Sequence, residues 1–133
     1  MKRGITNLPD TNVILRYLLR DHEEMYDRAA EFFDSVKRGE VRALVLESVL
    51  VECIYVLTKF YEVPREKTAA ALQELLRYRG IVNDDREQLI RALGLYAQTS
   101  VDPVDCVLYV KSIPENREPF SFDSDLDRLA GRK

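Results

Sequence analysis

The stretch Leu8-Pro9-Asp10-Thr11-Asn12 places a carboxylate where a short apolar segment ends and an amphipathic helix begins. Residues 4–9 have the character of a short strand, in which Pro9 fits only at the end because it lacks a backbone N–H. Apolar side chains at helical spacing follow from Val13 to Leu18. In open α/β sheets, ligands bind beyond the carboxyl ends of the strands. Asp10 is therefore placed for chemistry at a strand-to-helix junction.

Further strands and helices alternate along the chain. Further helices are predicted over 23–38, 48–61, 64–79, from 84 or 85 to about 97, 104–110 and 123–129. Further strands are predicted over 41–46, 81–82 and 120–122. Residues 112–119 are predicted to form a loop. This alternation predicts an α/β fold, a three-layer α/β/α sandwich with a mostly parallel central sheet. We expect residues 1–133 to form a single domain, since this length is typical of one domain.

The composition limits the kind of protein. The chain is 46% hydrophobic, which is enough for one substantial core, and its net charge of −3 argues against a broadly basic nucleic-acid-binding surface. A local basic patch near the first junction stays open, either as a phosphate-attracting surface or as ordinary solvated surface; its residues are Lys2, Arg3, Arg16 and Arg20. The chain has no apolar run long enough to span a membrane and nothing that resembles a signal peptide, so we expect a cytoplasmic protein without membrane association.

The cysteines and the single histidine exclude other chemistries. Cys53 and Cys106 each lie in an apolar run, which favours buried, reduced thiols over a disulfide. His22 lies in a polar stretch and is expected on the surface. With one histidine in the chain, a zinc site is improbable.

Glu52 is the only charged residue in the run from Val49 to Leu57. A carboxylate buried in such surroundings needs a cation, a metal ion or protonation, because an unpaired buried charge costs several kcal/mol. A capping box that starts at Ser48 would need its acid at position 51, which is valine. A metal site and a structural ion pair are the alternatives that remain for Glu52.

Three other acids interrupt or close apolar segments. Asp10, Asp105 and Asp123 each lie where a helix is predicted to begin, so each could simply cap that helix. Together with Glu52, however, they would form an oxygen-rich site if they converged on one crevice, and such a site suits Mg²⁺ or Mn²⁺.

Each acid belongs to a short motif. The motifs are Leu8-Pro9-Asp10-Thr11-Asn12-Val13-Ile14-Leu15-Arg16-Tyr17-Leu18, Ser48-Val49-Leu50-Val51-Glu52-Cys53-Ile54-Tyr55-Val56-Leu57, Val104-Asp105-Cys106-Val107-Leu108 and Phe120-Ser121-Phe122-Asp123-Ser124-Asp125-Leu126. In this order they resemble the acidic motifs of the PIN-domain family, in particular its VapC-type ribonuclease toxins. The resemblance spans nearly the whole chain.

The resemblance implies a parallel α/β/α sandwich and a metal-dependent endoribonuclease that hydrolyses RNA phosphodiester bonds with Mg²⁺ or Mn²⁺. It gives catalytic and metal-binding roles to Asp10, Glu52, Asp105 and Asp123, and supporting roles to Asn12 and Ser121. It also implies the toxin of a toxin–antitoxin pair, with an RNA substrate, a small cognate antitoxin and a homodimer as partners. Relatives often have threonine where this chain has Ser121, and an ordinary apolar strand residue at the position of Pro9.

Other classes of protein share parts of this pattern. One alternative is a catalytically inactive PIN-like module that binds RNA or protein. Another is an aspartate-based phosphatase or receiver-like domain, since these also begin with an aspartate after the first strand. Such phosphatases usually have a second aspartate two residues later, where this chain has Asn12, and the lysine that a receiver needs is not matched by the context of Lys111.

Overall fold

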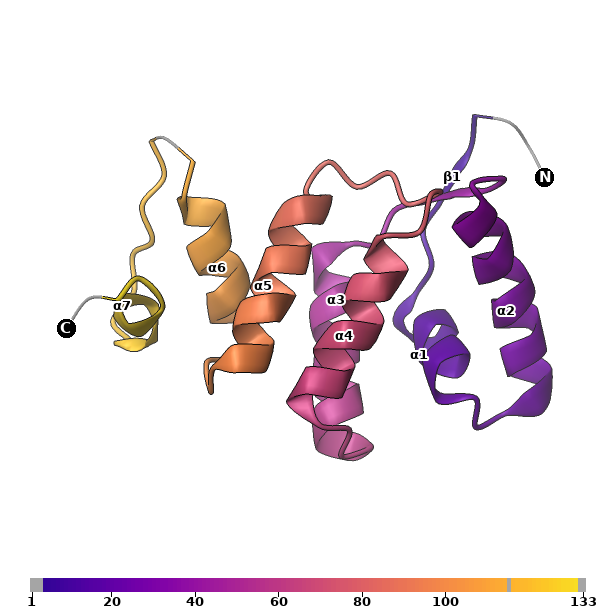
Figure 1. Cartoon of the computed structure of the whole chain (residues 1–133), viewed down its shortest axis with the longest axis horizontal. Coiled ribbons are helices and arrows are strands. Elements are labelled where there is room, and N and C mark those ends of the chain that lie inside the picture. Colours follow the sequence, from indigo (N-terminus) through magenta and orange to yellow (C-terminus); the bar gives the residue numbers. More distant parts are fainter. Residues whose placement is uncertain (1–3, 115, 132–133) are drawn as a thin grey trace.

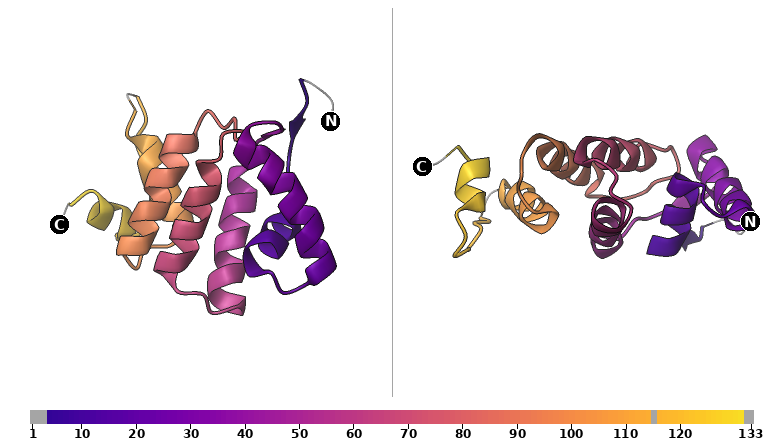
Figure 2. Two further views of the ribbon diagram at one scale, coloured as in Figure 1. Left: turned by 45° about the vertical axis from the view of Figure 1, so that its right-hand side comes forward. Right: turned by 90° about the horizontal axis from the view of Figure 1, so that it is seen from below.

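The computed structural model describes residues 4–114 and 116–131, and within them two very short parallel strands are combined with seven α-helices. The elements are β1 Thr6–Asn7, α1 Thr11–Leu19, α2 Glu23–Arg38, β2 Arg42–Ala43, α3 Glu47–Tyr55, α4 Arg65–Leu76, α5 Arg86–Gln98, α6 Pro103–Ser112 and α7 Asp125–Leu129. The helices lie side by side along the long axis of the molecule, with α2 at one end and α7 at the other (Figure 1). Seen from below, α4 and α5 lie on one side of the row that contains α1, α3 and α6 (Figure 2).

The sheet is built around β2. Thr6 of β1 lies opposite Arg42, and Asn7 lies opposite Ala43, in a parallel register. On its other side, Ala43 forms a parallel bridge with Ile81. Helical connections join these parallel segments, as the alternating sequence pattern predicts. The described part of the chain is therefore an α/β protein with a parallel sheet.

This sheet is smaller than the sequence predicts. The strand expected over 41–46 ends at Ala43 because the side chain of Asn83 then takes the place of a partner strand. Its Oδ1 accepts a hydrogen bond from the Val45 N–H at 2.9 Å, and its Nδ2 donates to the Val45 carbonyl at 2.8 Å. An asparagine that satisfies both backbone groups of one residue ends the ladder without leaving a buried polar group unpaired.

The strand predicted over 120–122 is wrong. Among the residues that the structure describes, this segment has no strand partner, and the side chains of Phe120 and Phe122 are 86% and 99% exposed. Two aromatic residues around one serine have the alternating pattern of a strand, but a sequence pattern does not reveal whether a pairing partner is within reach.

Helix positions agree more closely with the sequence. Asp10 caps α1, since its carboxylate accepts the Val13 N–H at 2.9 Å, and Gly39 ends α2 with a left-handed φ of 81°. Ser48 is not a cap, because α3 begins one residue earlier, at Glu47. The predicted long helix over 48–61 is α3 followed by a five-residue π-helix, Val56–Phe60.

The core joins all the larger helices to β2. Its largest fully buried side chains include Ile14, Phe33, Val45, Leu50, Ile54, Leu72, Leu75, Leu89 and Leu93. Cys53 and Cys106 are buried free thiols, as expected, and burial raises their pKa values to about 12 and about 11. The described helices include none with the length and apolar character needed to span a membrane.

Polar residues expected at the surface lie there. His22 is exposed and caps α2 through its Nδ1, which accepts the Met25 N–H at 3.2 Å. Of the basic residues near the first junction, Arg16 pairs with Asp21 at 2.8 Å, whereas Lys2 and Arg3 lie outside the described residues. Both alternatives for these residues, a phosphate-attracting patch and ordinary solvated surface, therefore stay open.

Two glycines provide a matched test of this packing. A Cβ atom at Gly80 would lie 2.0 Å from the Val41 carbonyl oxygen and 2.8 Å from that of Val36, whereas a Cβ at Gly94 would meet only the flexible Gln73 side chain, at 3.6 Å. Gly80→Ala should therefore destabilise the protein by about 3 kcal/mol or more, since backbone must move. Gly94→Ala, inside α5, should stabilise it by about 0.5–1 kcal/mol. Denaturant unfolding of both variants measures this, and a neutral Gly80→Ala would contradict the packing.

Candidate active site

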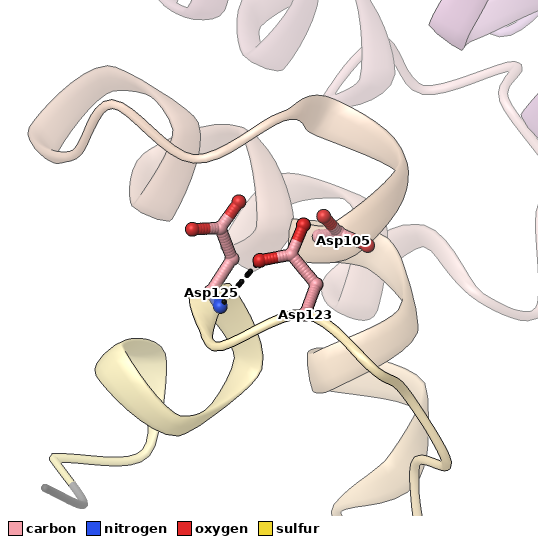
Figure 3. Close-up of side chains that lie close together, drawn as sticks. All are labelled: Asp105, Asp123 and Asp125. Atoms are coloured by element: carbon pink, nitrogen blue, oxygen red, sulfur yellow. Dashed lines mark hydrogen bonds between the residues drawn. The ribbon is translucent and has the colours of Figure 1, made fainter.

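Three carboxylates lie close together where α6 meets the segment before α7 (Figure 3). Asp105 comes from the first turn of α6, Asp123 from the segment before α7, and Asp125 from the first residue of α7. One carboxylate oxygen from each lies within 4.8 Å of the others. The fold thus brings together Asp105 and Asp123, two of the acids selected from the sequence, and adds Asp125.

The last two acids are ordered by a short series of local hydrogen bonds. The Ser121 hydroxyl oxygen accepts the N–H of Asp123 at 3.0 Å, and the carboxylate of Asp123 accepts the N–H of Asp125 at 3.1 Å. Turns of this kind fix a polar side chain against its own backbone. Ser121 is therefore in a position to support Asp123, and its functional role stays a prediction.

The cluster carries an excess of negative charge. Burial raises the pKa of Asp105 above its usual value, and the charges of Asp123 and Asp102 raise it further. Within residues 4–114 and 116–131, the ion pair of this cluster joins Arg128 to Asp125. Asp105 and Asp123 are thus left as repelling carboxylates, which a cation would stabilise.

Asp10 and Glu52 lie outside this cluster. Asp10 is exposed and its carboxylate is used as the cap of α1. Glu52 accepts a hydrogen bond from the hydroxyl of Thr11, which is the first residue of α1 and follows Asp10 directly. Both charges act on the Cys53 thiol, where they add to the effect of burial in raising its pKa. These two acids therefore form a second acidic group at the junction of α1 and α3.

The expectation that Glu52 is buried is wrong. Leu50, Cys53 and Ile54 face the core, and Glu52 lies on the exposed side of α3. An apolar run along a helix includes positions on both faces, so the run alone does not show which side chain turns outward. No ion pair of Glu52 is present in the described part of the chain, which leaves the structural ion-pair alternative without support.

Asn12 is the second residue of α1 and lies beside α2. It is exposed and lines a groove of about 400 Å³ between α1 and α2, together with Arg16 and Arg28. Its supporting role stays a prediction. Asp102 is used as the cap of α6, where it accepts the Val104 N–H at 3.0 Å.

Sequence reasoning did not select Asp125, Thr11 or Tyr55 for the site. Asp125 was visible as one of three aspartates at the start of a short helix, and the pattern could not distinguish a ligand from a cap. Thr11 and Tyr55 carry no pattern of their own, because their partners are 41 and 47 residues away in the sequence.

Comparisons with known proteins identify the family of this chain. The model of the PIN domain matches residues 8–132, so the chain belongs to the PIN-domain family. The chain is also similar to a protein named "VapC ribonuclease" from Aquifex aeolicus (strain VF5), with 28% identity over 106 residues that cover 79% of this chain and 77% of the relative. No solved structure matches the chain significantly.

The residues of the cluster fit a hard divalent cation. Carboxylate oxygens are the ligands that Mg²⁺ and Mn²⁺ prefer, and three of them lie within reach of one ion. Burial and the charges of Asp123 and Asp102 raise the pKa of Asp105, and a bound cation would offset this repulsion. The cluster contains neither histidine nor cysteine, which zinc would favour.

Removal of one charge should stabilise the metal-free protein. Because the pKa of Asp105 is raised on folding, its contribution to stability falls as pH rises from the unfolded value of about 3.9 through the folded value. Asp105→Asn should therefore raise the free energy of unfolding in EDTA at pH 7, by less than about 1 kcal/mol because solvent screens this partly exposed group.

Thermal melts at pH 3 and pH 7 measure this effect. The gain should disappear at pH 3, and saturating Mn²⁺ should reverse it, since only the wild type then gains the full binding energy. Asp127→Asn, which removes an exposed carboxylate outside the cluster, is the control. A destabilised Asp105→Asn variant in EDTA at pH 7 would show that Asp105 makes a structural contact instead.

Proposed function

We propose that the protein is a metal-dependent endoribonuclease that hydrolyses RNA phosphodiester bonds, and that it is the toxin of a toxin–antitoxin pair. The observation that carries the proposal is the cluster of Asp105, Asp123 and Asp125 in a member of the PIN-domain family. The similarity to a VapC ribonuclease supports RNA as the substrate.

The acids have separate roles in this proposal. Asp105, Asp123 and Asp125 hold Mg²⁺ or Mn²⁺, and Arg128 keeps Asp125 in place through its ion pair. Asp10 and Glu52 act from the α1–α3 side as the remaining catalytic and metal-binding acids of the family pattern. Ser121 and Asn12 support the site, Ser121 through its bond to the backbone of Asp123.

A bound divalent cation supplies activation of water for attack on phosphorus and neutralises negative charge that develops on the phosphate. The chain's own residues must then hold the phosphodiester and accept a proton. His22 is distant from the three aspartates in the sequence, and its Nδ1 is used as the cap of α2. A carboxylate is therefore the group available as general base.

The partners and the complete architecture are part of the same proposal. A small cognate antitoxin, a homodimer and a cytoplasmic location follow from the VapC-type resemblance. The three-layer sandwich is supported by the parallel pairing on both sides of β2. A receiver-like domain is disfavoured, because Lys111 is held by Glu47 at 2.8 Å and by Asp85 at 2.9 Å instead of facing Asp10.

Cleavage of RNA in the presence of Mn²⁺ tests the proposal. The purified protein should cleave a labelled RNA with Mn²⁺ or Mg²⁺ and lose this activity in EDTA. Asp123→Asn should lower kcat/KM by about 100-fold or more, the scale expected when an electrostatic group of an active site is removed. Asp127→Asn should retain activity, since its carboxylate lies outside the cluster.

Three outcomes would reject the proposal. Cleavage that persists in EDTA, or that is unchanged by Asp123→Asn, would indicate a contaminating nuclease or a different site. Binding of Mn²⁺ and RNA without any cleavage would instead identify the catalytically inactive binding module.

A further inference from the structure

Two polar contacts join α3 to α6 at opposite ends of the pair. At the start of α3, Glu47 contacts Lys111 near the end of α6 at 2.8 Å, and Lys111 also contacts Asp85 at 2.9 Å. At the end of α3, the hydroxyl of Tyr55 donates to Asp102, the cap of α6, at 2.6 Å. The helices are therefore antiparallel and held at both ends, but only the contact of Tyr55 lies at the end that carries Asp105.

Asp102 does two things with the same oxygen atom. Its Oδ1 accepts the hydroxyl of Tyr55 and also the Val104 N–H that begins α6. Asp105 follows three residues later, in the first turn of this helix. The hydrogen bond from Tyr55 thus fixes the turn from which the Asp105 carboxylate projects.

Tyr55 also lies on the same side of α3 as Glu52. The two residues are three positions apart in α3, so their side chains are neighbours on the helix surface. Glu52 accepts the hydroxyl of Thr11 from α1, whereas Tyr55 reaches to α6. A single turn of α3 therefore bonds to Thr11 of α1 through Glu52 and to Asp102, the cap of α6, through Tyr55.

We propose that Tyr55 is a positioning residue, which sets the place of Asp105 for metal binding by anchoring Asp102 to the same turn of α3 that carries Glu52. This inference rests on the proposed function for the identity of the bound cation. Tyr55 acts through Asp102 and touches no reacting group.

The pKa of the Tyr55 phenol is consistent with a hydroxyl that donates a hydrogen bond at every pH near neutrality. Burial raises the pKa of Tyr55 to about 12, and the hydrogen bond to Asp102 raises it as well, so the hydroxyl keeps its proton at neutral pH. The charge of Asp105 also acts on this phenol, which places the two side chains in the same electrostatic environment.

Titration of the wild type and Tyr55→Phe with Mn²⁺ in a calorimeter tests the proposal. Removal of one hydroxyl should raise the Kd for Mn²⁺ by about 10-fold, the lower end of the range found when a residue that orients a metal ligand is lost. In the cleavage assay the Mn²⁺ concentration for half-maximal activity should rise by the same factor. A change in Kd below threefold would overturn the proposal.

Two matched variants distinguish positioning from general loosening. Tyr61→Phe removes a phenol whose partner is Arg16, at 3.2 Å, and should leave the Kd for Mn²⁺ unchanged. Lys111→Met removes the contacts at the other end of the α3–α6 pair; it should lower the Tm without changing that Kd. If Lys111→Met weakens Mn²⁺ binding as much as Tyr55→Phe does, the effect is ordinary destabilisation and the proposal fails.

Substitutions of Asp102 complete the test. Asp102→Asn keeps the acceptor oxygen and the cap, so it should weaken Mn²⁺ binding less than Asp102→Ala does, and its own loss measures the effect of the Asp102 charge on Asp105. In the background of Asp102→Ala, Tyr55→Phe should have no further effect on the Kd, because the two residues act through one bond. Additive effects would overturn the proposal. If Asp102→Ala is poorly folded, the comparison of Tyr55→Phe with the wild type and with Lys111→Met still decides.

The proposed function can fail independently of this inference. A wild type that binds Mn²⁺ but cleaves no RNA would reject the nuclease and leave the calorimetric test of Tyr55 intact. A wild type that binds no Mn²⁺ would overturn both.

Discussion

The mutual repulsion of three carboxylates is the main physical constraint on the candidate active site. Asp105, Asp123 and Asp125 offer oxygen atoms within 4.8 Å of one another, a distance at which like charges oppose folding unless a cation intervenes. The fold holds them there from two sides. The first turn of α6 fixes Asp105, and local hydrogen bonds between Ser121, Asp123 and Asp125 fix the other two.

Interactions elsewhere in the molecule offset the unfavourable electrostatic free energy of these clustered carboxylates. Asp102 and Asp10 are satisfied as helix caps, and buried apolar side chains from α1 to α6 supply the stability that a charged cluster removes. Helix α3 links the acids at the α1–α3 junction to the first turn of α6. It carries Glu52 at the junction, and it bonds through Tyr55 to Asp102, the cap of the turn that carries Asp105.

Local signals in the sequence predicted the parts of the structure that depend on neighbouring residues. The cap at Asp10, the end of α2 at Gly39 and the buried thiols could all be read from short segments. The exposure of Glu52 and the absence of a strand over 120–122 could not, because each depends on elements distant in the chain. Of the four acids that the sequence groups together, the structure brings Asp105 and Asp123 into one cluster, and a shared site with Asp10 and Glu52 stays a prediction.

The central claim is that the three aspartates form a divalent-cation site. A crystal structure of the protein with Mn²⁺, recorded with anomalous diffraction, tests it most directly. The account predicts an anomalous peak between the carboxylates of Asp105, Asp123 and Asp125, at about 2.0–2.2 Å from an oxygen of each, and loss of that peak in crystals of Asp105→Asn. Mn²⁺ bound elsewhere, or no anomalous peak at saturating Mn²⁺, would contradict the account.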